Sequence, residues 1–151
     1  MIDSDKNRLD LAMKWGASLV ISSTDDSAAK AVMSFTENRG VDVAIEAVGL
    51  PESFDTCQRI VAAGGHIANV GVHGKPVELH LEKLWDRNIS ITTRLVDTAT
   101  TPMLLKVVRS GKLQPAQLVT HRFAMTDIMK AYDTFGNAEK EGALKVVLTS
   151  G

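Results

Sequence analysis

Short apolar runs rich in Val and Ile alternate along the chain with segments of helical periodicity, and this alternation most constrains the fold. The predicted strands are Ser18–Ile21, Val41–Ile45, His66–Val70, Ile89–Thr93 and Leu144–Leu148. Several of them have apolar residues on both faces, which is typical of a sheet covered by helices on both sides. Strands and helices that alternate in this way indicate right-handed crossovers and parallel pairing. The sequence therefore predicts an α/β protein with a doubly wound parallel sheet.

The segments between these runs have recognisable helix ends. We expect helices from near Asp5 to Gly16, from Thr24 to about Phe35, from Pro51 to Gly64, from Thr101 to Gly111 and from Thr126 to Gly136. Their spacing predicts that one face of each helix is buried. The predicted inward residues are Leu9, Ala12, Met13, Ala28, Val32, Phe35, Phe54, Cys57, Val61, Leu104, Val107, Val108, Ile128, Ala131, Tyr132 and Phe135.

Composition limits the classes of function. With 151 residues the chain is the size of about one domain, and we treat residues 1–151 as one partial domain. A net charge of −1 gives no electrostatic reason to expect a nucleic acid or an anionic membrane as partner. The chain has no apolar run long enough to span a bilayer and no signal peptide at its start. Its single cysteine, Cys57, suits a reducing compartment, so we expect a cytoplasmic protein.

The start of the chain departs from a complete dinucleotide-binding sheet. Only two apolar residues, Met1 and Ile2, precede the first predicted helix, and no G-x-G-x-x-G occurs. Such a sheet normally begins with a full strand and a glycine turn. We therefore interpret the chain as a Rossmann-like domain that lacks its first β-α unit.

Asp3 follows this short apolar stub directly. A carboxylate at the carboxyl end of a parallel strand can accept hydrogen bonds from both hydroxyls of an adenosine ribose, and its charge repels a 2′-phosphate. This chemistry favours NAD over NADP, with Arg8 beside the ribose. The alternative is that Asp3 caps the helix and Arg8 is a solvated charge.

Other candidate cofactor contacts follow two later strands. At the end of the strand His66–Val70, Val70 and Val72 offer apolar surface and Gly71 permits the close backbone approach that a nicotinamide ring requires. Val48 follows the strand Val41–Ile45, where adenine could lie. A buried strand with an ordinary glycine turn explains the same pattern. Lys145 could reach a pyrophosphate or point to solvent.

Two kinds of chemistry lack support. The four histidines (His66, His73, His80 and His121) have no metal-binding spacing, and one cysteine excludes a site with several thiolates. No G-x-S-x-G occurs, which leaves a hydrolase without its nucleophile turn.

The chain resembles the coenzyme-binding portion of medium-chain, zinc-dependent alcohol dehydrogenases. The matching stretches are Ile2–Leu9 through Trp15–Ala17, Gly40–Gly49, Ala63–Val72, Leu118–Phe123 and Ala143–Leu148. The resemblance implies that Asp3 binds the adenosine ribose of NAD with Arg8 beside it, that Val48 flanks adenine, and that Lys145 reaches the phosphates. It also implies that Val70, Gly71, Val72, Arg94 and Leu95 contact the nicotinamide half.

The same resemblance implies what this chain lacks. The family's catalytic zinc ligands belong to an N-terminal domain, to which the last strand and helices return. We therefore expect zinc and the alcohol or carbonyl substrate only in the full-length enzyme, and we expect this C-terminal portion alone to be inactive and to bind NAD weakly. In the family, the edge strand Ile89–Leu95 pairs across a two-fold axis, which implies a homodimer or homotetramer.

Several alternatives remain open. One is a polyol or amino-alcohol dehydrogenase of the same superfamily. A zinc-free quinone reductase gains nothing from Asp3, and a methyltransferase needs a glycine-rich loop before it. A non-catalytic nucleotide-binding module that dimerises through Ile89–Leu95 is the alternative outside enzymes.

Overall fold

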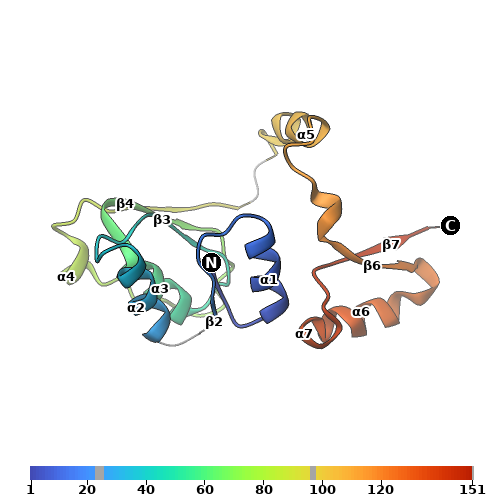
Figure 1. The fold of residues 1–151 in the computed structure, drawn as a ribbon, viewed down its shortest axis with the longest axis horizontal. Helices are drawn as coiled ribbons and strands as arrows, with labels where there is room; N and C mark the ends of the chain where they lie inside the picture. Colours follow the sequence, from blue (N-terminus) through green and yellow to red (C-terminus); the bar gives the residue numbers. More distant parts are fainter. Residues whose placement is uncertain (23–25, 96–97, 151) are drawn as a thin grey trace. The chain divides into compact units, whose positions relative to one another are not determined.

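The computed structural model describes residues 1–22, 26–95 and 98–150, which form two compact units. The first unit contains the described residues of 1–4 and 12–95, and the second contains residues 5–11 and 98–150 (Figure 1). Helix α1 (Lys6–Lys14) contributes residues to both units.

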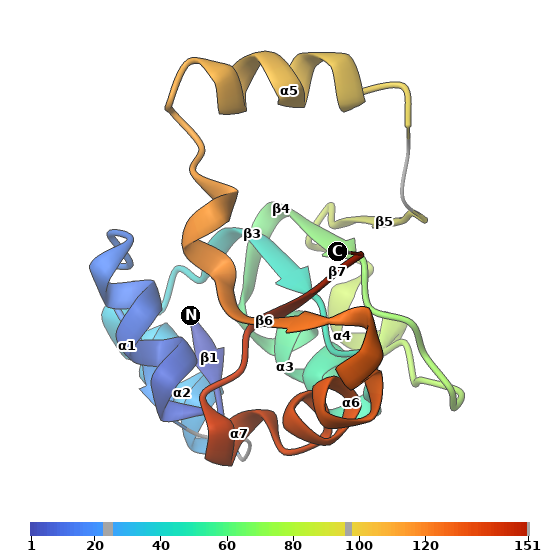
Figure 2. The same cartoon turned by 90° about the vertical axis from the view of Figure 1, so that its right-hand side faces the viewer.

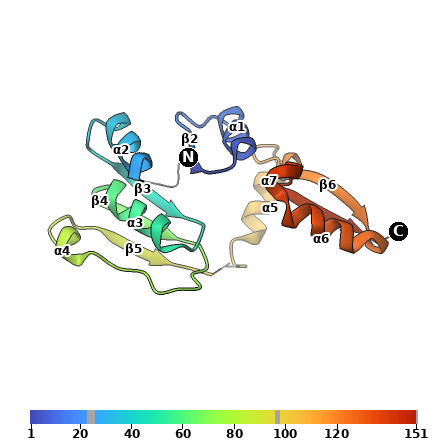
Figure 3. The ribbon, with the colours of Figure 1, turned by 90° about the horizontal axis from the view of Figure 1, so that it is seen from below.

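The strands of the first unit form two sheets with parallel pairing. β1 (Ile2–Asp3) pairs with β2 (Ile21–Ser22). The larger sheet has the order β3 (Val41–Glu46), β4 (Val61–Asn69), β5 (Ser90–Thr93), and its three strands lie side by side in Figure 3. Since β3 to β4 and β4 to β5 are both parallel, the carboxyl ends of all three strands lie at one edge of this sheet.

Helices α2 (Asp26–Phe35), α3 (Pro51–Ile60) and α4 (Leu81–Leu84) complete the first unit. Pro51 starts α3, where its missing N–H costs nothing. α3 packs against β3 and β4, and α2 packs against α3. The core between them contains Ala29, Val32, Ala44, Phe54, Cys57, Ile60, Val61 and Ile67.

The second unit contains α5 (Thr101–Arg109), β6 (Val119–Ala124), α6 (Ile128–Gly136), α7 (Ala138–Glu141) and β7 (Lys145–Thr149). Short 3-10 turns at Pro115–Leu118 and Met125–Asp127 flank β6. β6 and β7 are parallel, and α6 lies against both of them (Figure 2). Ala131 and Ala143 are buried, whereas α5 carries no buried side chain.

The alternation of strand and helix and the parallel pairing confirm the predicted fold class. Each predicted apolar run overlaps a strand, although the runs at 18–21 and 89–93 contribute shorter strands than expected. β6 is not among the predicted strands, because His121 interrupts the apolar face that Val119 and Phe123 would otherwise form. Thr24 and Asp25, the expected start of the second helix, lie outside the described residues.

The end of the third helix was predicted wrongly. α3 ends at Ile60, and Val61 already belongs to β4, with its N–H donating to the Cys57 carbonyl and its backbone extended. The prediction of Gly64 as the helix end fails because Val61–Ala63 are equally compatible with a helix and a strand. Val61 is fully buried as predicted, but as a strand residue.

Burial on several faces also differs from the prediction. Met13, Phe35, Leu104, Tyr132 and Phe135 are exposed, with 58% of Phe35 accessible. On β3, Ala44 and Glu46 are buried while Val43 and Ile45 are exposed, so this strand is not covered on both faces. Helical spacing predicts which residues share a face, but not how far a neighbouring element covers that face.

Within residues 1–22, 26–95 and 98–150, no helix combines the length and apolarity that crossing a bilayer requires.

Candidate functional site

Asp3 is the last residue of β1, at the carboxyl end of a parallel strand, as predicted. Its side chain is half-buried. The cap of α1 is a different carboxylate, because Asp5 Oδ1 accepts hydrogen bonds from the N–H groups of Asn7 (2.7 Å) and Arg8 (3.4 Å). The helix therefore has a cap that does not use the carboxylate of Asp3.

Arg8 lies in the first turn of α1. Its Nε is 3.5 Å from Asp5 Oδ2, and its side chain remains partly exposed. This contact assigns Arg8 a partner within the second unit, so the predicted place of Arg8 beside the ribose stays a prediction.

The segments that follow β3 and β4 present apolar side chains to solvent. Val48 is 65% exposed and Val72 is 82% exposed, and Val70 is also accessible. Exposed valines at the carboxyl ends of parallel strands provide apolar surface where ligands bind in open α/β sheets. Four of the predicted cofactor residues, Val48, Val70, Gly71 and Val72, are thus brought together at one edge of the β3–β4–β5 sheet.

These two segments, residues 47–50 and 70–73, are packed tightly against each other. The Glu46 carbonyl accepts hydrogen bonds from the N–H groups of Val70 (2.8 Å) and Gly71 (3.1 Å). Gly49 has φ +84°, and a Cβ there would overlap the Val72 carbonyl. A Cβ on Gly71 would overlap Glu46 Oε2. Glycine is therefore required at both positions by close approach, and at Gly49 also by backbone conformation.

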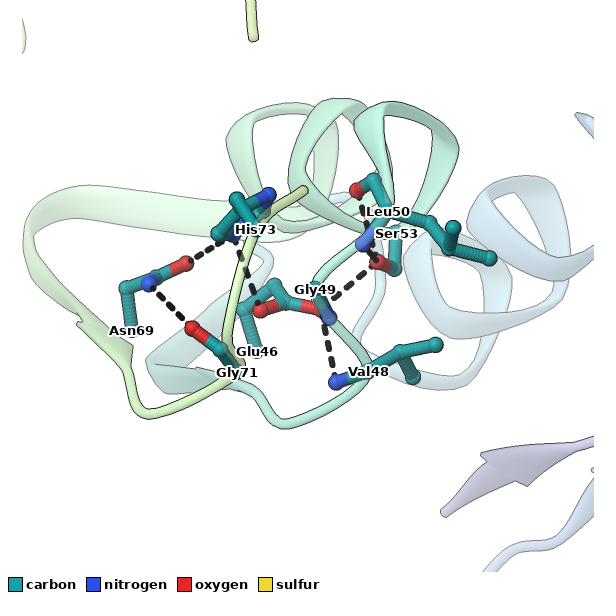
Figure 4. A network of polar contacts seen from close by, with 8 residues as sticks. All are labelled: Glu46, Val48, Gly49, Leu50, Ser53, Asn69, Gly71 and His73. Carbon is teal, nitrogen blue, oxygen red and sulfur yellow. Dashed lines mark hydrogen bonds and ion pairs between the residues drawn. The ribbon is translucent and has the colours of Figure 1, made fainter. Parts of the chain in front are cut away.

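The side chain of Glu46 lies at the centre of this packing (Figure 4). It is 1% exposed, and its Oε1 accepts hydrogen bonds from Val48 N–H (2.8 Å), Gly49 N–H (2.8 Å) and Ser53 Oγ (2.6 Å). Burial acts to raise the pKa of Glu46, but hydrogen bonds from Ser53, Gly49 and Val48 and the nearby His73 outweigh it and hold that pKa below its ordinary value. The carboxylate is therefore kept ionised inside the protein.

His73 closes the network from the second segment. Its Nε2 is 2.9 Å from Asn69 Oδ1 and 3.2 Å from Glu46 Oε2, and the Asn69 side-chain amide donates to the Gly71 carbonyl at 3.3 Å (Figure 4). The ring also meets Phe54 edge-on, with centroids 6.1 Å apart. These contacts fix the segment after β4 against both β3 and α3.

The remaining predicted residues lie in different places. Arg94 follows β5 and donates its N–H to the Asn69 carbonyl at 3.4 Å, so it lies near the end of β4, with an exposed side chain. Leu95 comes next and is exposed. Lys145 begins β7 in the second unit, and its carbonyl accepts a hydrogen bond from Thr120 Oγ1. The roles of Arg94, Leu95 and Lys145 therefore stay predictions.

Glu46, Ser53 and His73 were not predicted as site residues. The sequence contains one signal for Glu46. Glu46 is two residues after Ala44 and so lies on the same face of β3, which is buried and where a carboxylate is unexpected. Its donors come from the turn and helix that follow, and no local pattern indicates them.

Zinc does not fit the described residues. No group of three or more His, Cys, Asp or Glu side chains in the described parts of the chain could hold a metal ion.

Parallel strands with helices between them, and ligand-accessible residues at the strand carboxyl ends, define a Rossmann-like α/β domain. The chain belongs to the zinc-binding dehydrogenase family, whose model matches residues 1–110.

Individual relatives agree with this assignment. An alcohol dehydrogenase of Cupriavidus necator is 31% identical over 97% of this chain and 41% of its own length. The L-idonate 5-dehydrogenase of Vitis vinifera is 30% identical over 97% of this chain and 41% of its own length. Zinc dependent alcohol dehydrogenase 2 from Streptococcus pneumonia, solved in its apo form, is 50% identical with a TM-score of 0.94, over 99% of this chain and 44% of that one. The chain thus spans about two fifths of the length of these relatives.

Proposed function

We propose that this chain provides the NAD-binding portion of an alcohol dehydrogenase. The observation that carries the proposal is the half-buried carboxylate of Asp3 at the carboxyl end of β1, in the same unit as the exposed valines that follow β3 and β4. A carboxylate for ribose hydroxyls and apolar surface for flat rings are the two elements that dinucleotide recognition needs. Membership in the dehydrogenase family supports this combination.

In this proposal each residue has a binding role. Asp3 accepts hydrogen bonds from the ribose, Val48 contacts adenine, and Val70, Gly71 and Val72 contact the nicotinamide half. Arg8, Arg94, Leu95 and Lys145 complete the set as predicted from the resemblance. Bound NAD supplies the chemistry by accepting a hydride from the alcohol carbon.

The reaction itself requires groups outside the described residues. In the family a zinc ion acts as Lewis acid on the alcohol oxygen, and the described residues offer no site for it. We therefore expect the purified 151-residue chain to show no robust turnover of alcohol with NAD at any zinc concentration.

The test of the proposal is a comparison of NAD and NADP binding by calorimetric titration. We expect the chain to prefer NAD, and Asp3→Asn to weaken NAD binding about tenfold with little effect on NADP, because one charge-assisted contact is lost. Asp42→Asn is the matched control, since Asp42 is an exposed carboxylate near the opposite end of β3 that pairs with Arg39. Equal affinities for the two nucleotides in the unmodified chain, or equal effects of the two variants, would contradict the proposal.

The substrate class has two candidates. An alcohol is favoured by the alcohol dehydrogenases among the relatives. A polyol is the second candidate, because other relatives are an L-idonate 5-dehydrogenase and an L-arabinitol 4-dehydrogenase. Turnover of simple alcohols against polyols by the full-length enzyme separates the two.

We also propose that the chain forms a homodimer or homotetramer through the strand at Ile89–Leu95, in a cytoplasmic setting suited to its buried cysteine. All four residues of β5 are exposed, and among the described residues this strand lies at the edge of its sheet. We expect Ile91→Lys with Leu95→Lys to convert the assembly to a monomer by light scattering. An unchanged mass would exclude this edge as the interface. It would contradict dimerisation through Ile89–Leu95 both for the enzyme and for the alternative of a non-catalytic dimerising module.

A further inference from the structure

Glu46 makes hydrogen bonds with two separate segments at the proposed nucleotide-binding edge. Its backbone carbonyl binds the N–H groups of Val70 and Gly71, which begin the segment after β4. Its side chain binds the N–H groups of Val48 and Gly49, in the segment after β3. One residue therefore holds both segments from which the predicted adenine and nicotinamide contacts come.

We propose that the Glu46 carboxylate is a positioning residue that couples residues 47–50 to residues 70–73, so that the two segments form one rigid nucleotide-binding edge. This inference rests on the proposed function, since the ligand of that edge is taken to be NAD. Glu46 itself is buried and does not contact the nucleotide; it acts through Val48 on one side and Val72 on the other.

The two oxygens of the carboxylate serve different segments. Oε1 accepts hydrogen bonds from the N–H groups of Val48 and Gly49 and from the Ser53 hydroxyl, which links the first segment to α3. Oε2 faces the second segment, where His73 Nε2 lies 3.2 Å away. Oε2 also lies so close to Gly71 that a Cβ on that residue would overlap it. The contact of Oε2 with the second segment can therefore be removed while an acceptor is kept for the first segment.

Substitution chemistry predicts the effect of each change. In Glu46→Gln the amide oxygen still accepts the hydrogen bonds from Val48 and Gly49, but an uncharged NH₂ group replaces the oxygen that faces His73. In Glu46→Ala both contacts are lost, and the buried N–H group of Gly49 is left without an acceptor. Glu52→Gln is the matched control, because it removes the same charge from an exposed position in the first turn of α3.

The test is residue-resolved hydrogen exchange on the whole chain, followed by NAD titration. For Glu46→Ala we expect exchange at Val48, Gly49 and Gly71 to accelerate together by about tenfold or more, while Ala44 and Ile67 in the adjoining strands stay protected. For Glu46→Gln we expect residues 70–73 to accelerate as in Glu46→Ala, and we expect Val48 and Gly49 to accelerate less than in that variant, because their hydrogen bonds weaken but keep an acceptor. The control should match the unmodified chain.

The outcomes are distinguishable. If hydrogen exchange in Glu46→Ala accelerates only in residues 47–50, the coupling is overturned. If that variant does not fold, unchanged hydrogen exchange in residues 70–73 of Glu46→Gln overturns the coupling instead. NAD affinity that is unchanged in a variant with both segments loosened would overturn the positioning role, whereas about tenfold weaker binding supports it. If the unmodified chain does not respond to NAD, the proposed function fails, and exchange still decides the coupling.

Discussion

Replacing Glu46 by Gln should lower the stability of the chain in a pH-dependent way. The substitution keeps the shape of the side chain but removes the charge from an oxygen that accepts three hydrogen bonds. A hydrogen bond to a carboxylate exceeds a neutral one by about 1 kcal/mol, which gives about 3 kcal/mol for three bonds. Relief from burying a charge offsets part of this, so we expect a loss of about 2 to 3 kcal/mol at pH 7.

The pH dependence follows from the direction of the pKa shift. The pKa of Glu46 is lower in the folded chain than its ordinary value of 4.5, so the ionised form stabilises the fold. This contribution is fully present above the ordinary pKa and is lost as the pH falls through the folded pKa. The difference between the unmodified chain and Glu46→Gln should therefore be constant near neutrality and shrink below about pH 4.5.

Thermal unfolding followed by circular dichroism from pH 3 to pH 8 measures both quantities. For a chain of this size the expected loss corresponds to a decrease in Tm of about 4 to 12 °C at pH 7. Glu52→Gln, with the same change of charge at an exposed position, should stay within about 1 °C of the unmodified chain. A decrease at pH 7 no larger than that of Glu52→Gln, or one that persists undiminished at pH 3, would refute the reasoning.

Two further predictions concern the same unit. Burial and the nearby Glu46 raise the pKa of Cys57 to about 11 from 9.0, so at pH 8 its thiolate fraction should be about a hundredfold below that of an ordinary thiol. Its reaction with a thiol reagent should therefore be slow in the folded chain and fast in denaturant. Equal rates under the two conditions would contradict the burial of Cys57. Gly49→Ala should be more destabilising than Gly16→Ala by chemical denaturation, because both glycines have positive φ but a Cβ meets the Val72 carbonyl only at Gly49. We expect a loss of about 1 kcal/mol at Gly16 and clearly more at Gly49, and equal losses would show that the segments separate easily.

The candidate site was predictable only in part. Val48, Val70 and Val72 lie at or just after the carboxyl ends of predicted strands, and Asp3 follows the apolar stub Met1–Ile2. A ligand-binding edge is expected at strand carboxyl ends in any open parallel sheet. Glu46 was not identified, because the partners of its carboxylate come from the following turn, from α3 and from the segment after β4. From local sequence alone, a buried glutamate at the end of a strand cannot be distinguished from one that is exposed to solvent.

The amino-acid sequence by itself determined the alternation of strands and helices except for β6, α4 and α7, the start of α3 at Pro51 and the parallel pairing. These follow from local periodicity, from the geometry of proline and from the handedness of crossovers. Only the tertiary structure decided that Val61 starts a strand, that Val43 and Ile45 are exposed on β3, and that Glu46 is buried and ionised. Burial depends on which distant segments cover a side chain, and an ionised carboxylate is stable inside a protein only where the folded chain brings enough donors to it.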